Sequence, residues 1–102
     1  MLAKVYILRF TNLNDARHAA TQVSEAMGKH LGKYDLSGLT VLLRKEGTVK
    51  VIARFDCQKA FQRMQSSRPE VLAEVQNLYP CMIEDASAVT VFSYERDATV
   101  TV

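Results

Sequence analysis

The sequence predicts one α+β domain in which two helices cover one face of a four-stranded antiparallel sheet. Three observations support this prediction. The chain has 102 residues, which fits a single domain spanning residues 1–102. Segments of β-forming residues and helical patterns follow each other in the order β-α-β-β-α-β. Strand-like segments are apolar at alternate positions, whereas helix-like segments are apolar at intervals of three and four residues.

The first strand is predicted over residues 2–10, which are rich in β-forming side chains. Asn12 follows as a helix N-cap, because its side chain can accept a hydrogen bond from an amide of the first turn. The helix is predicted over residues 13–31. Its apolar positions have helical spacing and are Ala16, Ala19, Ala20, Val23, Met27 and Leu31.

The second half of the chain begins with a hairpin. Residues 38–44 and 48–55 read as strands, joined at Gly47, which can adopt a positive φ. A second helix follows, and Pro69 divides it into two segments. The last strand is predicted over residues 87–102, a sequence without Gly or Pro that is rich in Val, Thr, Phe and Tyr.

The element order is that of the split βαβ, or ferredoxin-like, arrangement. Odd-numbered positions of the four strands form an apolar set, which we assign to the face under the helices. Even-numbered positions are also largely apolar, and an exposed apolar sheet face is typical of an interface. The predicted homodimer interface consists of Tyr6, Leu8, Leu42, Ile52, Phe92, Tyr94, Val100 and Val102.

In its element order, its two apolar sheet faces and its long last strand, the sequence resembles the dimeric α+β barrel superfamily. The resemblance covers nearly the whole chain and includes no diagnostic motif, so it indicates no specific family. It implies a ferredoxin-like subunit that pairs with a second copy of itself through the sheet. Members include small monooxygenases and polyketide cyclases, and their ligands typically lie between the sheet and the helices.

Small side chains recur on the surfaces of the sheet and first helix that should meet. They leave either close packing or a cavity for an apolar ligand. The leading hypothesis is a homodimeric small-molecule-binding protein that holds an elongated, fatty-acid-like molecule with a polar or carboxylate end. The predicted ligand-binding residues are Arg9, His18, Met27, Ala53, Phe61, Met64 and Ser93.

Two other classes of function stay open. A cofactorless monooxygenase or cyclase would need polar groups in the cavity, for which His18, Arg9, Ser93 and Tyr6 are candidates. No catalytic residue is assigned, although Asp15 and His18 are one helical turn apart and could pair at the surface. An interaction module without a ligand is the other class.

Composition argues against several partners. Lys and Arg number 13 and Asp and Glu 11, a net charge of +2 that does not favour nucleic acid. Residues 50–57 also lack the glycines and paired aromatics of an RNA-binding sheet. His18 and His30 lie about 18 Å apart on one helix and cannot share a metal, and no cofactor motif is present.

The sequence also indicates where the protein works. No apolar segment approaches the roughly 18 residues that span a bilayer, and the N-terminus lacks the features of a signal peptide. Cys57 and Cys81 match no zinc or redox spacing. We therefore expect reduced thiols and a cytoplasmic location.

Overall fold

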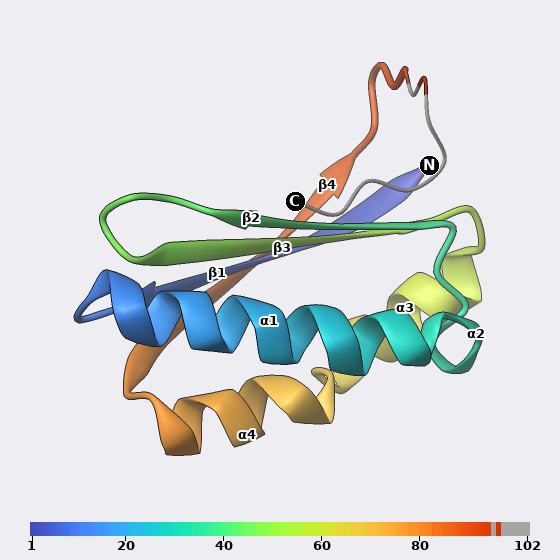
Figure 1. The fold of residues 1–102 in the computed structure, drawn as a ribbon. Helices are drawn as coiled ribbons and strands as arrows, with labels where there is room; N and C mark the ends of the chain where they lie inside the picture. Colours follow the sequence, from blue (N-terminus) through green and yellow to red (C-terminus); the bar gives the residue numbers. More distant parts are fainter. Residues whose placement is uncertain (95, 97–102) are drawn as a thin grey trace.

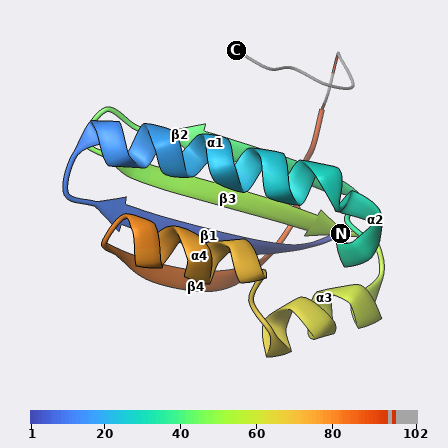
Figure 2. The ribbon, with the colours of Figure 1, turned by 60° about the horizontal axis from the view of Figure 1, so that its bottom comes forward.

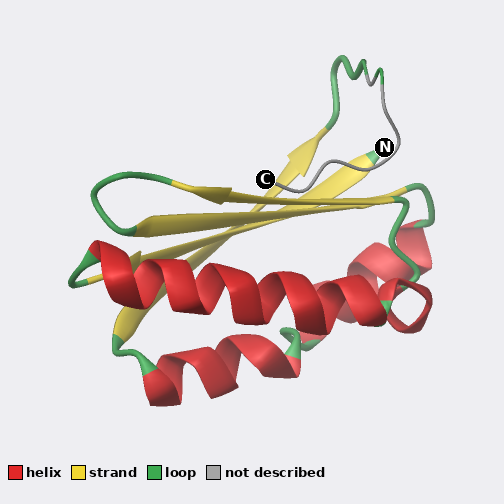
Figure 3. Ribbon diagram, in the orientation of Figure 1, coloured by secondary structure: helices red, strands yellow, loops and turns green. Residues whose placement is uncertain are grey.

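The structure is a computed structural model that describes residues 1–94 and 96, and it has two layers, a sheet and a set of helices on one of its faces (Figures 1 and 3). In chain order, the elements are β1 (Leu2–Phe10), α1 (Leu13–Lys29), α2 (Leu31–Tyr34), β2 (Gly38–Leu43), β3 (Thr48–Phe55), α3 (Gln58–Ser66), α4 (Glu70–Leu78) and β4 (Cys81–Val89). No helix in the described ranges has the length and apolar character needed to cross a membrane.

The sheet has the order β2-β3-β1-β4, with every neighbouring pair antiparallel. Helix α1 packs against β2, β3 and α4, and α3 packs against β1. Figure 2 shows α1 running along the β2–β3 side of the sheet and α4 along the β1–β4 side. This arrangement confirms the predicted ferredoxin-like fold.

Local signals in the sequence act as expected at three junctions. The Asn12 side chain accepts a hydrogen bond of 2.8 Å from the Asp15 amide and begins α1. Gly47 closes the β2–β3 hairpin with φ 97°, a conformation that side chains other than glycine rarely adopt. The helical region after β3 is indeed divided, because α3 ends at Ser66 and Pro69 precedes α4.

The last strand differs from its prediction in position. It begins six residues earlier than expected, at Cys81, and ends at Val89. Residues 90–94 and 96 belong to no strand, and the remainder of the predicted strand lies outside the described residues. The sequence Cys81–Ala86 was missed because its charged residues obscure the alternation of an edge strand that is exposed on both faces.

The two faces of β1 are also exchanged relative to the prediction. Tyr6 pairs with Val51 and Leu8 with Val49, so even positions of β1 share the helix-covered face with odd positions of β3. Tyr6 and Leu8 are fully buried there. The assignment of these two residues to the open face is therefore wrong. Its physical cause is that the connection between two strands sets their register, so the parity of residue numbers does not carry over.

The open face of the sheet is nevertheless apolar at its centre. The side chains that form this apolar stripe are Val5, Ile7, Ile52 and Ala86; Leu42 lies beyond Lys50 on the same face, and Met82 lies beside Arg9. Arg9 and Glu84 form an ion pair beside it. Leu42 and Met82 are 46% and 69% exposed.

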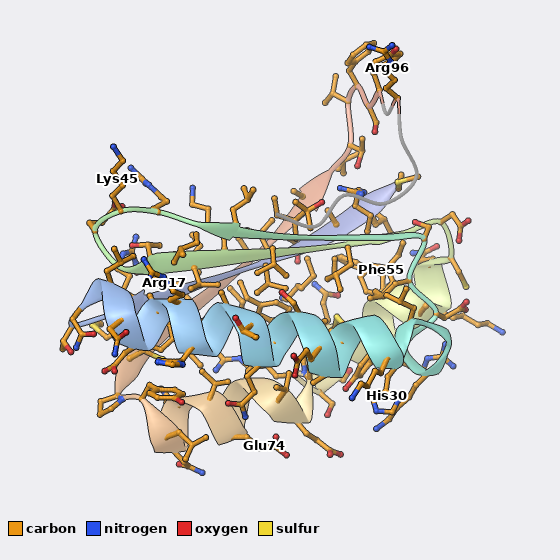
Figure 4. All side chains as sticks on the ribbon, viewed as in Figure 1. Arg17, His30, Lys45, Phe55, Glu74 and Arg96 are labelled. Carbon is orange, nitrogen blue, oxygen red and sulfur yellow. The ribbon has the colours of Figure 1, made fainter. Side chains whose placement is uncertain are left out.

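The remaining predicted interface residues follow β4. Phe92 and Tyr94 are exposed, whereas Val100 and Val102 lie outside the described residues. The segment after β4 rises on the side of the sheet away from the helices (Figure 1). Arg96 is labelled at its far end in Figure 4.

Candidate ligand-binding site

The helix-covered side of the sheet has two halves with different packing. In the closed half, α1 lies on β2 and β3, and the facing side chains of α1 and β3 form an apolar layer that is fully buried at its centre. These side chains are Ala16, Ala19, Val23, Met27, Val49, Val51 and Ala53. Figure 4 shows Phe55 pointing into this space from β3. Here the small residues allow close packing, the alternative that the sequence left open.

The structure separates the seven predicted ligand-binding residues into two groups. Four of them join a single core, and these are Met27, Ala53, Phe61 and Met64. Arg9 lies on the opposite face of the sheet. His18 is exposed and stacks on Tyr79 with 6.1 Å between ring centroids, and Ser93 is exposed beyond the end of β4.

The second half contains a cleft of about 190 Å³, which we call the α3–α4 cleft. It lies between α2, α3 and the linker to α4. Its lining residues are Lys33, Tyr34, Ala60, Arg63, Met64, Ser67, Arg68 and Glu70. Among the predicted ligand-binding residues, Met64 is in this lining. The cleft is smaller than most ligand pockets of about 300–1,000 Å³, so it suits a small ligand or one end of a longer molecule.

Tyr6 in β1 is coupled electrostatically to residues in the wall of this cleft. Its side chain is fully buried, and its hydroxyl has no hydrogen-bond partner among the described residues. Burial raises the pKa of the hydroxyl well above its ordinary value, and the charge of Asp85 raises the pKa further while that of Arg68 opposes the rise. Tyr34 also raises this pKa, so the charges of two residues of the cleft wall, Tyr34 and Arg68, act on the Tyr6 hydroxyl.

An unsatisfied buried hydroxyl costs about 1–3 kcal/mol. Such a group in an otherwise well-packed protein calls for an explanation, and a ligand or water that completes the hydrogen bond is the common one. Because its raised pKa keeps Tyr6 neutral, the hydroxyl can both donate and accept a hydrogen bond.

Polar side chains surround Tyr6 on the β4 side. Asp85, its neighbour in the sheet, accepts a hydrogen bond of 3.0 Å from Nε of Arg68. Ser87 accepts one of 3.0 Å from Nε2 of Gln65. Lys4 shares the face of Tyr6, pairs with Ser87 and is only 8% exposed. Together these residues form a polar cluster where the helices leave the edge strand uncovered.

Sequence reasoning missed most of this cluster. Arg68 lies beside Pro69, where the sequence predicts only a break between helices, and Asp85 lies in the part of β4 that precedes the predicted strand. One signal in the sequence of β1 could have indicated it: Lys4 shares a face of the strand with the apolar residues Tyr6, Leu8 and Phe10. No cluster of metal-ligating side chains is found in residues 1–94 and 96.

Comparison with known proteins shows the fold. No protein-family model and no curated protein matches the chain. A candidate antibiotic biosynthesis monooxygenase from Deinococcus radiodurans is similar in structure with a TM-score of 0.69 and 10% identity, over 96% of this chain and 100% of that chain. A dimeric ferredoxin-like protein from an uncultured marine organism gives 0.65 and 14%, over 94% and 100%.

A third similar structure is SnoaB, a cofactor-independent oxygenase from Streptomyces nogalater. Its TM-score is 0.58 at 14% identity, over 93% of this chain and 97% of that chain. Identities this low establish a shared ferredoxin-like fold, of the kind found in dimeric α+β barrel proteins, and nothing about the reaction.

Proposed function

We propose that the protein is a homodimeric small-molecule-binding protein that takes an apolar molecule with a polar end into the α3–α4 cleft. The observation that supports this most is the buried Tyr6 hydroxyl, which lacks a partner in the described part of the chain. The polar end of the ligand would hydrogen-bond to this hydroxyl. The apolar body would lie against Ala60, Met64 and the Tyr34 ring.

Access to Tyr6 requires a small rearrangement of the cleft wall. Tyr6 is not itself in the lining, whereas Arg68 is. The Arg68 side chain is 46% exposed, so its ion pair with Asp85 is weakly held and rotation of the side chain costs little. A ligand that displaces the Arg68 side chain from the cleft wall would therefore reach the Tyr6 hydroxyl without disturbing the sheet.

A titration with a neutral probe tests the binding proposal. Octanamide, which combines an alkyl chain with a hydrogen-bonding end, is added to isotope-labelled protein and followed by NMR. We expect shifts at residues of the α3–α4 cleft, and affinity reduced about twofold to tenfold in Tyr6→Phe through loss of one neutral hydrogen bond. Tyr94→Phe, an exposed control, should bind as the unmodified protein does. Absence of cleft shifts would refute the proposal.

The homodimer proposal is supported by the apolar stripe on the open face of the sheet. Exposed apolar patches of this kind commonly mark protein–protein interfaces, and one structural neighbour is described as dimeric. A charge at the centre of the stripe should separate the subunits, because it would be buried without a partner. We expect a dimer by light scattering for the unmodified protein and a monomer for Ile52→Lys.

A matched control for this variant is Leu78→Lys. Leu78 is also an exposed apolar residue, at 61%, but it ends α4 on the other side of the molecule. This variant should stay dimeric. A monomeric unmodified protein, or an Ile52→Lys dimer of unchanged affinity, would argue against pairing through the open face.

A cofactorless oxygenase is the second candidate, favoured by the neutral Tyr6 donor and by the neighbours described as oxygenases. Such an enzyme needs a substrate that reduces oxygen itself. An activated CH₂ group loses two hydrogens and gains one oxygen atom from O₂, and the other oxygen atom leaves as water. The Tyr6 hydroxyl would donate a hydrogen bond to the carbanion in its enolate form.

Oxygen uptake with dithranol, an anthrone that oxidises slowly by itself, tests this candidate. Catalysis would consume one O₂ per molecule of quinone formed, and Tyr6→Phe would slow it while Tyr94→Phe would not. Uptake no faster than the background reaction in all three proteins would remove the oxygenase candidate for this substrate class.

We also place the protein in the cytoplasm. Cys57 and Cys81 are free thiols in the structure, which suits a reducing compartment. Cell fractionation with antibody detection tests this location.

A further inference from the structure

We propose that the ligand of the α3–α4 cleft is a carboxylic acid and that Arg68 binds its carboxylate beside the Tyr6 hydroxyl. This inference rests on the proposed binding function and adds the charge of the ligand and the residue that recognises it. It follows from the hydrogen bonds that Arg68 makes, the position of Lys4 and the charges around the cleft.

Arg68 uses little of its hydrogen-bonding capacity. A guanidinium group has five N–H donors arranged as a planar fork. In the described part of the chain, Arg68 donates through Nε to one oxygen of Asp85 and makes no other polar contact. Its two terminal nitrogens are therefore available to a ligand. A carboxylate is the group that matches this fork with two parallel hydrogen bonds.

Lys4 is a second cation without an anion. Its alkyl stem is buried, whereas its ammonium group reaches solvent and pairs with no carboxylate among the described residues. Lys4 faces the same side as Tyr6 and pairs with Ser87, next to the Asp85 position that Arg68 contacts. An anion in this region would add a favourable interaction with the unpaired Lys4 ammonium.

The other charges around the cleft leave room for an anion. Arg63 reaches Asp35 at 3.8 Å, a weak pair between exposed side chains. Lys33 lies over the Tyr34 ring, 5.6 Å from its centroid, and contacts no carboxylate in the described part. Glu70 is the acidic member of the lining and is exposed at the start of α4. The lining therefore contains three cations against one carboxylate, with Asp35 and Asp85 outside it.

The cleft volume limits the size of the acid. About 190 Å³ corresponds to roughly six water molecules at their share of the liquid volume. Ala60 and Met64 provide an apolar surface for an alkyl chain of medium length. Octanoate is therefore a suitable probe, and octanamide is its neutral analogue with the same chain.

The experiment compares octanoate and octanamide by calorimetry at pH 7. We expect octanoate to bind at least tenfold more tightly, because hydrogen bonds to charged groups are stronger than neutral ones. Arg68→Gln should remove this advantage and leave octanamide binding within about twofold of its original value. Arg17→Gln, which removes an exposed cation of α1 far from the lining, should change neither affinity.

Asp85→Asn should change the affinity for octanoate in the opposite direction to Arg68→Gln. This variant removes the carboxylate that competes for Arg68, so octanoate should bind more tightly than to the unmodified protein. Lys4→Met should weaken octanoate alone, by less than Arg68→Gln does. The thermal melting of each variant is recorded to show that it is folded.

The outcomes separate this inference from the binding proposal. Equal affinity for octanoate and octanamide would leave an apolar cleft and overturn the carboxylate assignment. Binding of neither probe would overturn both. If Asp85→Asn weakens octanoate as much as Arg68→Gln does, the ion pair has a structural role and Arg68 is not the carboxylate receptor.

Discussion

The closed half and the cleft half of the helix-covered face are built on one sheet but packed differently. Under α1, a single helix of 17 residues fully buries the facing side chains of β3. On the other side, two helices of nine residues meet at a break, and the cleft lies there. The cleft therefore arises from the interruption of the helical layer, because the residues of the break, Ser67 and Arg68, form part of its wall.

The break also supplies the residue that is proposed to bind the ligand. Arg68 lies in the linker between Ser66 and Glu70, where the backbone is not helical. From that position, its side chain reaches Asp85 on the edge strand. Each half thus has its own contribution: the closed half stabilises the fold, and the cleft half exposes polar groups.

The largest expected difference between the halves concerns methionine truncation. Met27→Ala in the closed half should lower the free energy of unfolding by about 2–5 kcal/mol, since it leaves a sealed cavity. Met64→Ala should cost about half as much, because the vacated space joins the open α3–α4 cleft and leaves no sealed cavity. Urea denaturation of both variants measures the difference. Equal losses would show that the cleft wall is packed like the core.

Tyr6→Phe should act in the opposite direction and stabilise the protein by about 1–2 kcal/mol, since it removes a buried hydroxyl without a partner. A more stable variant that binds ligand less well is typical of a functional site. The same denaturation experiment measures it, with Tyr94→Phe as a control of unchanged stability. A destabilised Tyr6→Phe would mean that the hydroxyl is satisfied in the free protein.

Tyr6 should also make stability depend on pH at the alkaline end. Its pKa is raised in the folded protein, so the unfolded chain loses this proton first as the pH rises. The contribution is constant below an unfolded pKa of about 10 and then falls by up to about 1.4 kcal/mol per pH unit. The difference in stability between the unmodified protein and Tyr6→Phe should follow this curve. A difference that stays flat from pH 8 to pH 11 would be inconsistent with it.

The smallest effect is expected at Arg68. Its ion pair with Asp85 joins side chains that are 46% and 31% exposed, and pairs of this kind contribute about 0–1 kcal/mol. Arg68→Gln should therefore change the free energy of unfolding by less than about 1 kcal/mol while it alters ligand binding. A loss of several kcal/mol would assign Arg68 to the stability of the fold.

Local patterns predicted much of the architecture because their physical causes are local. Asn12 caps α1 by bonding an amide three residues away, Gly47 allows the hairpin turn, and Pro69 accompanies the helix break. The β-α-β-β-α-β order followed from these signals.

The site depends on contacts between distant residues and was less predictable. The register of β1 against β3 decides that Tyr6 faces the helices, and residue numbers do not encode it. Arg68 meets Asp85 across 17 positions. Met64 lines the cleft. Its position on the inner face of the helix could be predicted, because helical spacing can be read without knowing the register of the strands.

The most direct test of the account uses the four methionines of the chain, labelled with ¹³C in their methyl groups. Met64 reports on the cleft, Met27 on the closed half and Met82 on the open face. On addition of octanoate, the account predicts a saturable shift of the Met64 methyl signal while those of Met27 and Met82 stay in place. A shift of Met27 equal to that of Met64, or no shift at Met64, would contradict the assignment of the ligand site.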